Sequence, residues 1–409
     1  MMREGIQPYA AILVFLLTAG ILFVTHLQRR EVSPTEGEKN GPRIFPVCRA
    51  PGDQRSPALA WGGDHYFAVW ADERCGDRKC TDLFGTPIGR NGEVRTPEGL
   101  AITQGKAYEG HPAIAWNGES FLVVWEDHRC GHPRCADIYG ARLLPDGTVT
   151  AERAISQAPN RQAVPQVAWN GKTFLVVWQD GRSGTGSGKA DIYGARVDPT
   201  GNVLDPEGIP LVTARESQVV PRIAWGRDRF LLVWSSQRRC DDLQCYAGIH
   251  GLWLDAEGKP LERLENGFPI SPATGGQYVP DVGWDGRSFL VAWDDRLNRE
   301  KRADIYARRF SPFTPGAIFP ISTRPEREIA PAILATPKGF SLFWMVGSRG
   351  GEDIYHTEVT PDGVEGGRPF VAAPGRQGAL RGVWGERGAL LLWEDERGGD
   401  ADILAAPLW

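Results

Sequence analysis

Residues 111–129 spell HPAIAWNGESFLVVWEDHR and residues 164–182 spell VPQVAWNGKTFLVVWQDGR, so the chain repeats itself. After each stretch comes a loop and then the segment ADIYGAR, at 136–142 and again at 190–196. The tryptophan that ends the apolar run recurs at steps of 49 to 59 residues, as Trp70, Trp125, Trp178, Trp234, Trp293, Trp344 and Trp393. A period near 50 with several strand-like segments in each unit is typical of propeller blades, because one small sheet cannot bury both faces alone.

Each unit contains four predicted strands. The first has the pattern P-x-[IV]-A-W and is followed by a tight turn such as Asn170–Gly171. The second is an uninterrupted apolar run, F-L-V-V-W, which suits a strand packed on both faces. The third is D-I-Y-G-A-R, and a turn at 145–147 leads to a short outer strand at 153–156. The sequence therefore predicts an all-β, seven-bladed propeller of four-stranded antiparallel blades.

The last blade is predicted to be closed by the N-terminal region. The seventh unit begins near Ala379 and reaches Trp409 without a fourth strand. Residues 44–48, IFPVC, resemble such a strand and directly precede the first unit. We expect this strand to complete blade seven, because such closure removes exposed sheet edges and ties the two ends of the propeller together.

An apolar segment precedes the propeller. Residues 9–25, YAAILVFLLTAGILFVT, carry no charge and are just long enough for one hydrophobic helix across a membrane. We interpret 1–26 as a membrane anchor or signal segment, with an uncleaved anchor favoured because no convincing small-x-small cleavage site follows. Residues 27–43 then form a polar tether, and 44–409 form the propeller.

The cysteines indicate the compartment. Six of the seven form C-x4-C pairs at one place in the repeat: Cys75/Cys80, Cys130/Cys135 and Cys240/Cys245. Each pair predicts a local disulfide, which requires an oxidising compartment. A structural zinc site usually needs four ligands where each blade offers two thiols, so no metal site is expected. We expect the propeller on the outer side of the cytoplasmic membrane, or secreted if the segment is cleaved, with Cys48 as a small buried hydrophobe.

From about residue 44 onward, the chain resembles bacterial exported propeller-repeat proteins. It is broadly similar to the propellers of the TolB and sialidase-like families. The resemblance implies the fold and carries little about function. The sialidase pattern S-x-D-x-G-x-T-W is not intact here, and only the Asp and Gly of turns such as 145–147 resemble it in part.

Two sets of polar residues recur in the blades. The pattern W-x-D-x-R gives Asp72/Arg74, Asp127/Arg129, Asp180/Arg182 and Asp395/Arg397, with a shifted Asp295/Arg296. Because it recurs, we interpret it as a structural carboxylate–guanidinium pair. Near the start of the first strand every blade has Gln or Glu: Gln54, Glu109, Gln162, Gln218, Gln277, Glu328 and Gln377. This ring is either scaffold that satisfies backbone groups or a polar collar that binds a ligand at the channel mouth.

Loop lengths differ among the blades. From the strand-two tryptophan to the third strand there are 12 to 14 residues in blades one to four, 11 in blade five and nine in blades six and seven. These loops share a face with the connections between blades, and long loops on a rigid scaffold often bind partners. Blade two adds His111, His128 and His132 to this face, at spacings that match no metal motif.

These features favour a binding protein over an enzyme. The net charge of −5 argues against a large nucleic-acid surface, and no catalytic or cofactor motif is present. We expect a binding or assembly module that holds a protein or glycan partner on the disulfide-stapled loop face of blades one to four. One alternative is a glycan-active hydrolase or lyase that uses Glu109 and Glu328 at the channel mouth. Another is a structural component of an envelope assembly.

Overall fold

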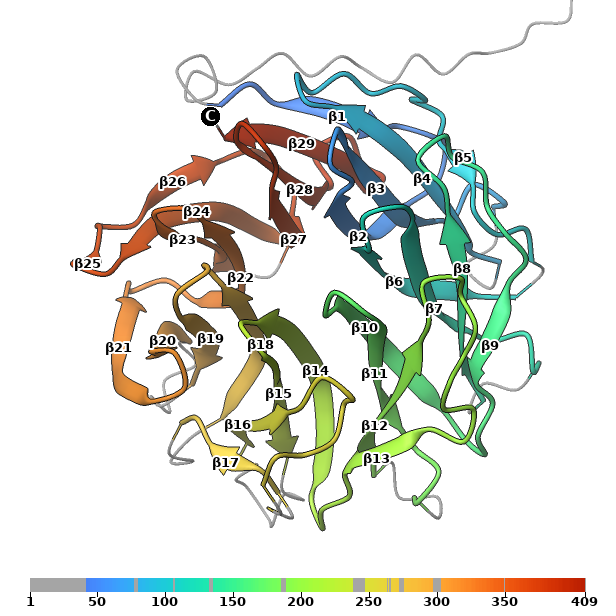
Figure 1. Ribbon diagram of the computed structural model, residues 1–409. Coiled ribbons are helices and arrows are strands. Elements are labelled where there is room, and N and C mark those ends of the chain that lie inside the picture. The colour runs from blue at the N-terminus through green and yellow to red at the C-terminus, as the bar shows by residue number, and fades with distance from the viewer. Residues whose placement is uncertain are drawn as a thin grey trace, which may run out of the picture. The chain divides into compact units, whose positions relative to one another are not determined.

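The computed structural model describes residues 42–76, 80–105, 107–131, 135–184, 189–237, 247–262, 264, 266–271, 276–296, 303–348 and 350–408. These residues form seven antiparallel sheets arranged as blades around a central axis (Figure 1). The predicted all-β, seven-bladed propeller is therefore confirmed. Among the described residues no helix is long and apolar enough to cross a membrane, and the apolar run at 9–25 lies outside them.

The strands of each blade run from the axis outward. Blade one contains β2 (Gln54–Trp61), β3 (His65–Asp72), β4 (Asp82–Gly89) and β5 (Leu100–Ala101), and blade two contains β6 (Glu109–Trp116), β7 (Phe121–Asp127), β8 (Asp137–Leu143) and β9 (Arg153–Ser156). Blade three contains β10 (Gln162–Trp169), β11 (Phe174–Asp180), β12 (Asp191–Val197) and β13 (Ile209–Val212). Blade four contains β14 (Ser217–Gly226), β15 (Arg229–Gln237), β16 (Ala247–Leu254) and β17 (Phe268–Pro269).

The remaining blades differ at their outer edges. Blade five contains β18 (Gln277–Trp284), β19 (Phe289–Asp295), β20 (Asp304–Phe310) and β21 (Pro315–Ser322). Blade six contains β22 (Glu328–Thr336), β23 (Gly339–Ser348) and β24 (Gly351–Thr360), and both β25 (Gly363–Val364) and β26 (Arg368–Val371) pair with β24. Blade seven contains β27 (Gln377–Trp384), β28 (Ala389–Asp395) and β29 (Asp402–Leu408).

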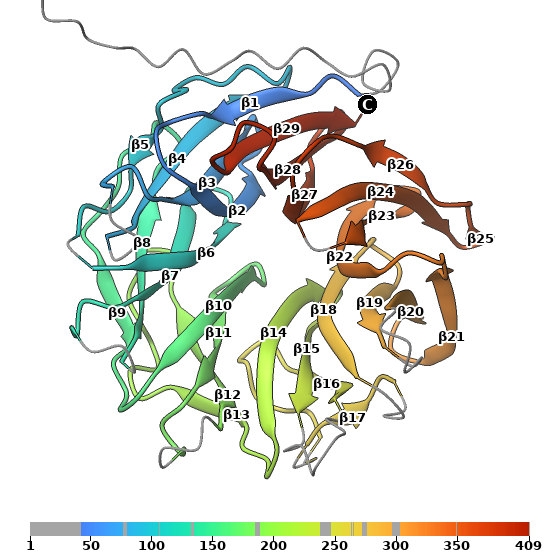
Figure 2. The ribbon, with the colours of Figure 1, turned by 180° about the vertical axis from the view of Figure 1, so that it is seen from behind.

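Blade seven takes its outer strand from the N-terminal side of the propeller. The strand β1 (Phe45–Cys48) pairs antiparallel with β29, with Phe45 opposite Ala405 and Pro46 opposite Leu404 (Figure 2). Val47 and Cys48 are almost fully buried in this position. The predicted closure is therefore confirmed, and it covers the edge that β29 would otherwise expose.

The second strand of each blade is buried on both faces. In β3, Phe67 and Val69 pack toward blade two, where the rings of Phe67 and Phe121 lie 5.5 Å apart. The alternate residue Trp70 packs toward blade seven. All seven strand-two tryptophans are almost completely buried, and each such side chain contributes roughly 2 to 3 kcal/mol through burial. The cores therefore lie between neighbouring blades, as the uninterrupted apolar runs predict.

Every inner strand contains a bulge with a left-handed residue. This residue has φ between 45° and 54° and is Ser56, His111, Val164, Val220, Val279, Ala330 or Ala379. Such values are uncommon for residues other than glycine, and especially for valine. In several blades a side chain of the preceding blade binds the backbone N–H of the bulge. Ser56 donates to Glu394 at 2.6 Å, and Val220 donates to Gln179 at 2.7 Å. The bulges therefore connect neighbouring blades near the axis.

Candidate functional site

The W-x-D-x-R pattern forms a structural unit. The Trp178 indole donates to Asp180 at 2.8 Å, and Arg182 donates to both oxygens of that carboxylate at 2.9 and 2.7 Å. The guanidinium also stacks on Tyr193, 4.0 Å from the ring centroid. The same carboxylate–guanidinium pair forms in three other blades, at Asp72/Arg74, Asp127/Arg129 and Asp395/Arg397. Its recurrence and burial match the structural interpretation.

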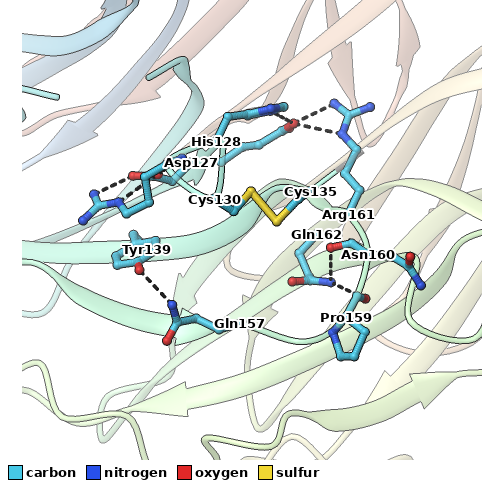
Figure 3. The surroundings of a disulfide bond; sticks show 12 residues. Asp127, His128, Cys130, Cys135, Tyr139, Gln157, Pro159, Asn160, Arg161 and Gln162 are labelled. Carbon is cyan, nitrogen blue, oxygen red and sulfur yellow. Dashed lines mark hydrogen bonds and ion pairs between the residues drawn. A yellow bond between two sulfur atoms is a disulfide. The ribbon is translucent and has the colours of Figure 1, made fainter. Parts of the chain in front are cut away.

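The Gln/Glu ring lies inside the blades. All seven side chains are at most 2% exposed: Gln54, Glu109, Gln162, Gln218, Gln277, Glu328 and Gln377. Several of the amides donate to carbonyls of the preceding connection, as Gln162 does to Pro159 and Asn160 (Figure 3). These contacts favour the scaffold alternative, because a ligand at the channel mouth could not reach side chains so deeply buried.

The two acidic members of the ring are equally enclosed. Burial raises the pKa of Glu109 to about 8, although a hydrogen bond with Thr103 acts in the opposite direction. Burial also raises the pKa of Glu328, which accepts hydrogen bonds from the Trp344 indole at 2.8 Å and from the Arg324 backbone at 3.1 Å. Neither carboxyl group is open to a substrate in this arrangement. The hydrolase alternative therefore gains no support from this pair.

A dense polar cluster lies where blades two and three meet, beside the connection that follows β7 and the connection between β9 and β10. The buried carboxylate of Glu126 lies 2.8 Å from His128 Nε2, 2.6 Å from Arg161 Nη2 and 3.2 Å from His111 Nδ1. Burial alone would raise the pKa of Glu126, but the two histidines and Arg161 hold it well below its usual range. The repeat pattern gave no indication of this cluster, since its members come from three different segments of the chain.

A disulfide lies beside this cluster. Cys130 and Cys135 are bonded, and Figure 3 shows their bond between His128 and Arg161 on one side and Tyr139 on the other. In blade one the thiol of Cys75 lies against the backbone carbonyl of Cys80, and the bond between these two stays a prediction. Cys240 and Cys245 lie outside the described residues.

The remaining cysteine is a core residue. Cys48 is 1% exposed and packs with Val47 and Trp70 between blades one and seven. Burial raises the pKa of its thiol to about 11, so the thiol is protonated at neutral pH. This agrees with its interpretation as a small buried hydrophobe.

Metal-binding groups do not assemble in the part of the chain that the structure describes. No set of three His, Cys, Asp or Glu side chains there has the geometry of a metal site. His111 and His128 contact Glu126 instead, and His132 lies outside the described residues.

The connections after the second strands differ among the blades, as their lengths in the sequence indicate. They span 73–81, 128–136, 181–190, 238–246 and 296–303 in blades one to five, and only 349–350 and 396–401 in blades six and seven. We define the loop face as the first four of these connections together with the inter-blade connections beside them.

Comparisons with known proteins find similar solved structures at low sequence identity. No family model and no curated protein matches the chain. The β-propeller domain of the trilobed protease from Pyrococcus furiosus is 12% identical over 87% of this chain and 95% of that one, with a TM-score of 0.49. The α-L-arabinanase of Penicillium chrysogenum is 10% identical over 92% and 98%, with a TM-score of 0.48. A subtype N11 neuraminidase-like protein of A/flat-faced bat/Peru/033/2010 is 10% identical over 80% and 92%, with a TM-score of 0.44.

Proposed function

We propose that this protein is a binding module that holds a protein or glycan partner on its loop face. The observation that carries the proposal is the restriction of long, cysteine-bearing connections to one part of a regular scaffold. A purely structural ring requires no such asymmetry, whereas extended loops on a rigid support commonly form binding surfaces.

The Glu126 cluster supports the same surface. Arg161 is fixed by Glu126, yet its side chain is 52% exposed, and that of His111 is 40% exposed. A donor that is both exposed and held in one orientation loses little conformational entropy when a partner binds. Arginine is also among the residues that contribute most at protein interfaces. The disulfide between Cys130 and Cys135 joins two residues of the connection that follows β7, which also reduces the conformational entropy lost when a partner binds.

In this proposal the apolar segment at 9–25 holds the propeller on the outer side of the cytoplasmic membrane. An oxidising compartment would allow the disulfides to form and persist. The loop face would then be presented to partners in the cell envelope.

The test replaces residues 128–136 with the sequence of 396–401 in the full-length protein. The shorter sequence contains Arg397 in the place of Arg129, so the pair with Asp127 is retained. A second variant, Arg161→Ala, removes the exposed guanidinium alone. Crosslinking in the native cells with mass spectrometry then compares both variants with the wild type.

A matched control alters the opposite face, by shortening the turn at 144–148 that joins β8 to the outer part of blade two. We expect a crosslinked partner or glycan to be lost in the loop exchange, weakened in Arg161→Ala and retained in the control. Equal crosslinking in all folded variants would refute a partner site on this face.

A further inference from the structure

The channel-facing position of the inner strands departs from the repeat. A cavity of about 240 Å³ on the axis is lined by the inner strands of all seven blades. The residue after the strand-one proline, or its equivalent, belongs to this lining in each blade: Ala58, Ala113, Gln166, Arg222, Asp281, Ala332 and Arg381. A scaffold role predicts one residue type throughout, and the neighbouring position comes close to this, with proline in six of the seven blades. Alanine in three blades and polar or charged residues in the other four indicate a local specialisation of the channel.

Three charged side chains contribute to this cavity from blades four, five and seven. Arg222 Nε lies 3.9 Å from Asp281 Oδ1, and the second carboxylate oxygen accepts a hydrogen bond from the Ile333 backbone at 2.7 Å. Arg381 donates to the Leu380 carbonyl at 2.7 Å and forms no ion pair with a carboxylate among the described residues. The side chains of Arg222 and Asp281 are 12% and 24% exposed.

The cluster carries an excess of positive charge. Burial and the nearby charge of Arg381 lower the pKa of Arg222 to about 10, so Arg222 is still charged at neutral pH. Burial raises the pKa of Asp281, although Arg222 and Arg381 act in the opposite direction. Even with Asp281 ionised, two guanidinium groups face one carboxylate. Arg381 is half-buried and none of the described carboxylates forms an ion pair with it, so its charge favours an anion bound in the cavity.

We propose that the channel binds an oxyanion between Arg222 and Arg381. A guanidinium presents paired N–H donors that match a carboxylate, phosphate or sulfate group. In this site Asp281 orients Arg222 and reduces the net charge without cancelling it. The ligand is either a free inorganic oxyanion or the acidic group of a larger molecule that enters along the axis. The site is distinct from the loop face and does not depend on the proposed partner.

The test titrates the detergent-solubilised full-length protein with inorganic phosphate and, separately, with glucuronate, using calorimetry. Arg222→Gln and Arg381→Gln should each weaken binding about tenfold or more, because a hydrogen bond to a charged group is lost. Asp281→Asn should tighten binding severalfold, because it removes the competing negative charge. Arg153→Gln, on an exposed residue of β9, makes the same charge change away from the channel and should leave the affinity unchanged.

The two probes distinguish the sources of the anion. Channel-dependent binding of phosphate alone identifies a free inorganic ion, and channel-dependent binding of glucuronate identifies the acidic group of a larger ligand. Circular dichroism establishes which variants fold. If an arginine variant does not fold, Asp281→Asn provides the test: tighter anion binding than in the wild type supports the proposal, and unchanged binding contradicts it. Absence of saturable binding of both probes to the wild type, or equal affinities in the wild type and every folded channel variant, would overturn the proposal.

Discussion

The indole nitrogen of Trp344 donates its hydrogen bond to Glu328, a residue on the neighbouring strand of the same blade. In blades one, two, three, five and seven the equivalent indole binds an aspartate two residues further along its own strand. Blade six has Val346 at that position, and blade four has Ser236 and uses Gln218 as the acceptor. The ring residue and the strand aspartate are therefore interchangeable partners for one buried N–H group.

Glu328→Ala should destabilise the propeller by about 1 to 3 kcal/mol, because it leaves the buried indole N–H of Trp344 without an acceptor. Glu328→Gln should destabilise the propeller clearly less, since Gln218 accepts the hydrogen bond of the equivalent tryptophan in blade four. Urea unfolding followed by tryptophan fluorescence measures both. Equal destabilisation by Ala and Gln would show that the hydrogen bond to Trp344 is not what position 328 contributes.

Glu109 should make stability depend on pH. Its pKa is raised from 4.5 to about 8 in the folded protein, so between these values the folded state binds more protons than the unfolded state. Stability due to this group is therefore present at low pH and falls as pH rises through that window. Glu109→Gln should match the wild type near pH 5 and exceed it by more than about 1 kcal/mol at pH 9. Thermal unfolding of both proteins between pH 5 and pH 9 tests this prediction. If the stabilities of the wild type and Glu109→Gln change with pH in parallel, the raised pKa of Glu109 is contradicted.

The repeat predicts the scaffold because its constant positions obey simple geometry. An uninterrupted apolar run such as 174–178, repeated once in each unit and bounded by turns, suits a strand covered on both faces. A missing fourth strand in blade seven and a matching segment at 44–48 then determine how the ring closes. Both predictions follow from local patterns and strand pairing, and the structure confirms them.

The candidate sites were harder to predict, for two physical reasons. The sequence gives the spacing of Gln162 from its proline but not the bulge at Val164, and the bulge affects which way the side chain points. The Glu126 cluster joins the end of β7 to His111 in the inner strand β6 and to Arg161 in the connection between β9 and β10, which no repeat spacing relates. For the same reason, a search for recurring residues does not find Arg381, because the equivalent position in the other blades holds alanine, glutamine, aspartate or a single arginine, Arg222.

Asp180 should be among the most sensitive carboxylates of the propeller. Asp180→Ala removes the acceptor of both Trp178 and Arg182, and we expect a loss of about 3 kcal/mol or more. Asp180→Asn keeps an acceptor for the Trp178 indole and should therefore reduce stability less than Asp180→Ala. Asp228→Ala, on an exposed aspartate paired with Arg229, is the control and should change stability by less than about 0.5 kcal/mol. Comparable urea midpoints for Asp180→Ala and the control would contradict a structural role for the W-x-D-x-R unit.

Removal of β1 should open the ring. A chain that starts at residue 42 retains the pairing of Phe45 with Ala405, whereas a chain that starts at residue 50 leaves the edge of β29 exposed. An uncovered edge strand can pair with another molecule, and the burial of Val47 and Cys48 is lost with it. The longer chain should be monomeric in light scattering, and the shorter one should melt several degrees lower and self-associate. Two monomers with equal melting temperatures would mean that blades one and seven hold together without the N-terminal strand.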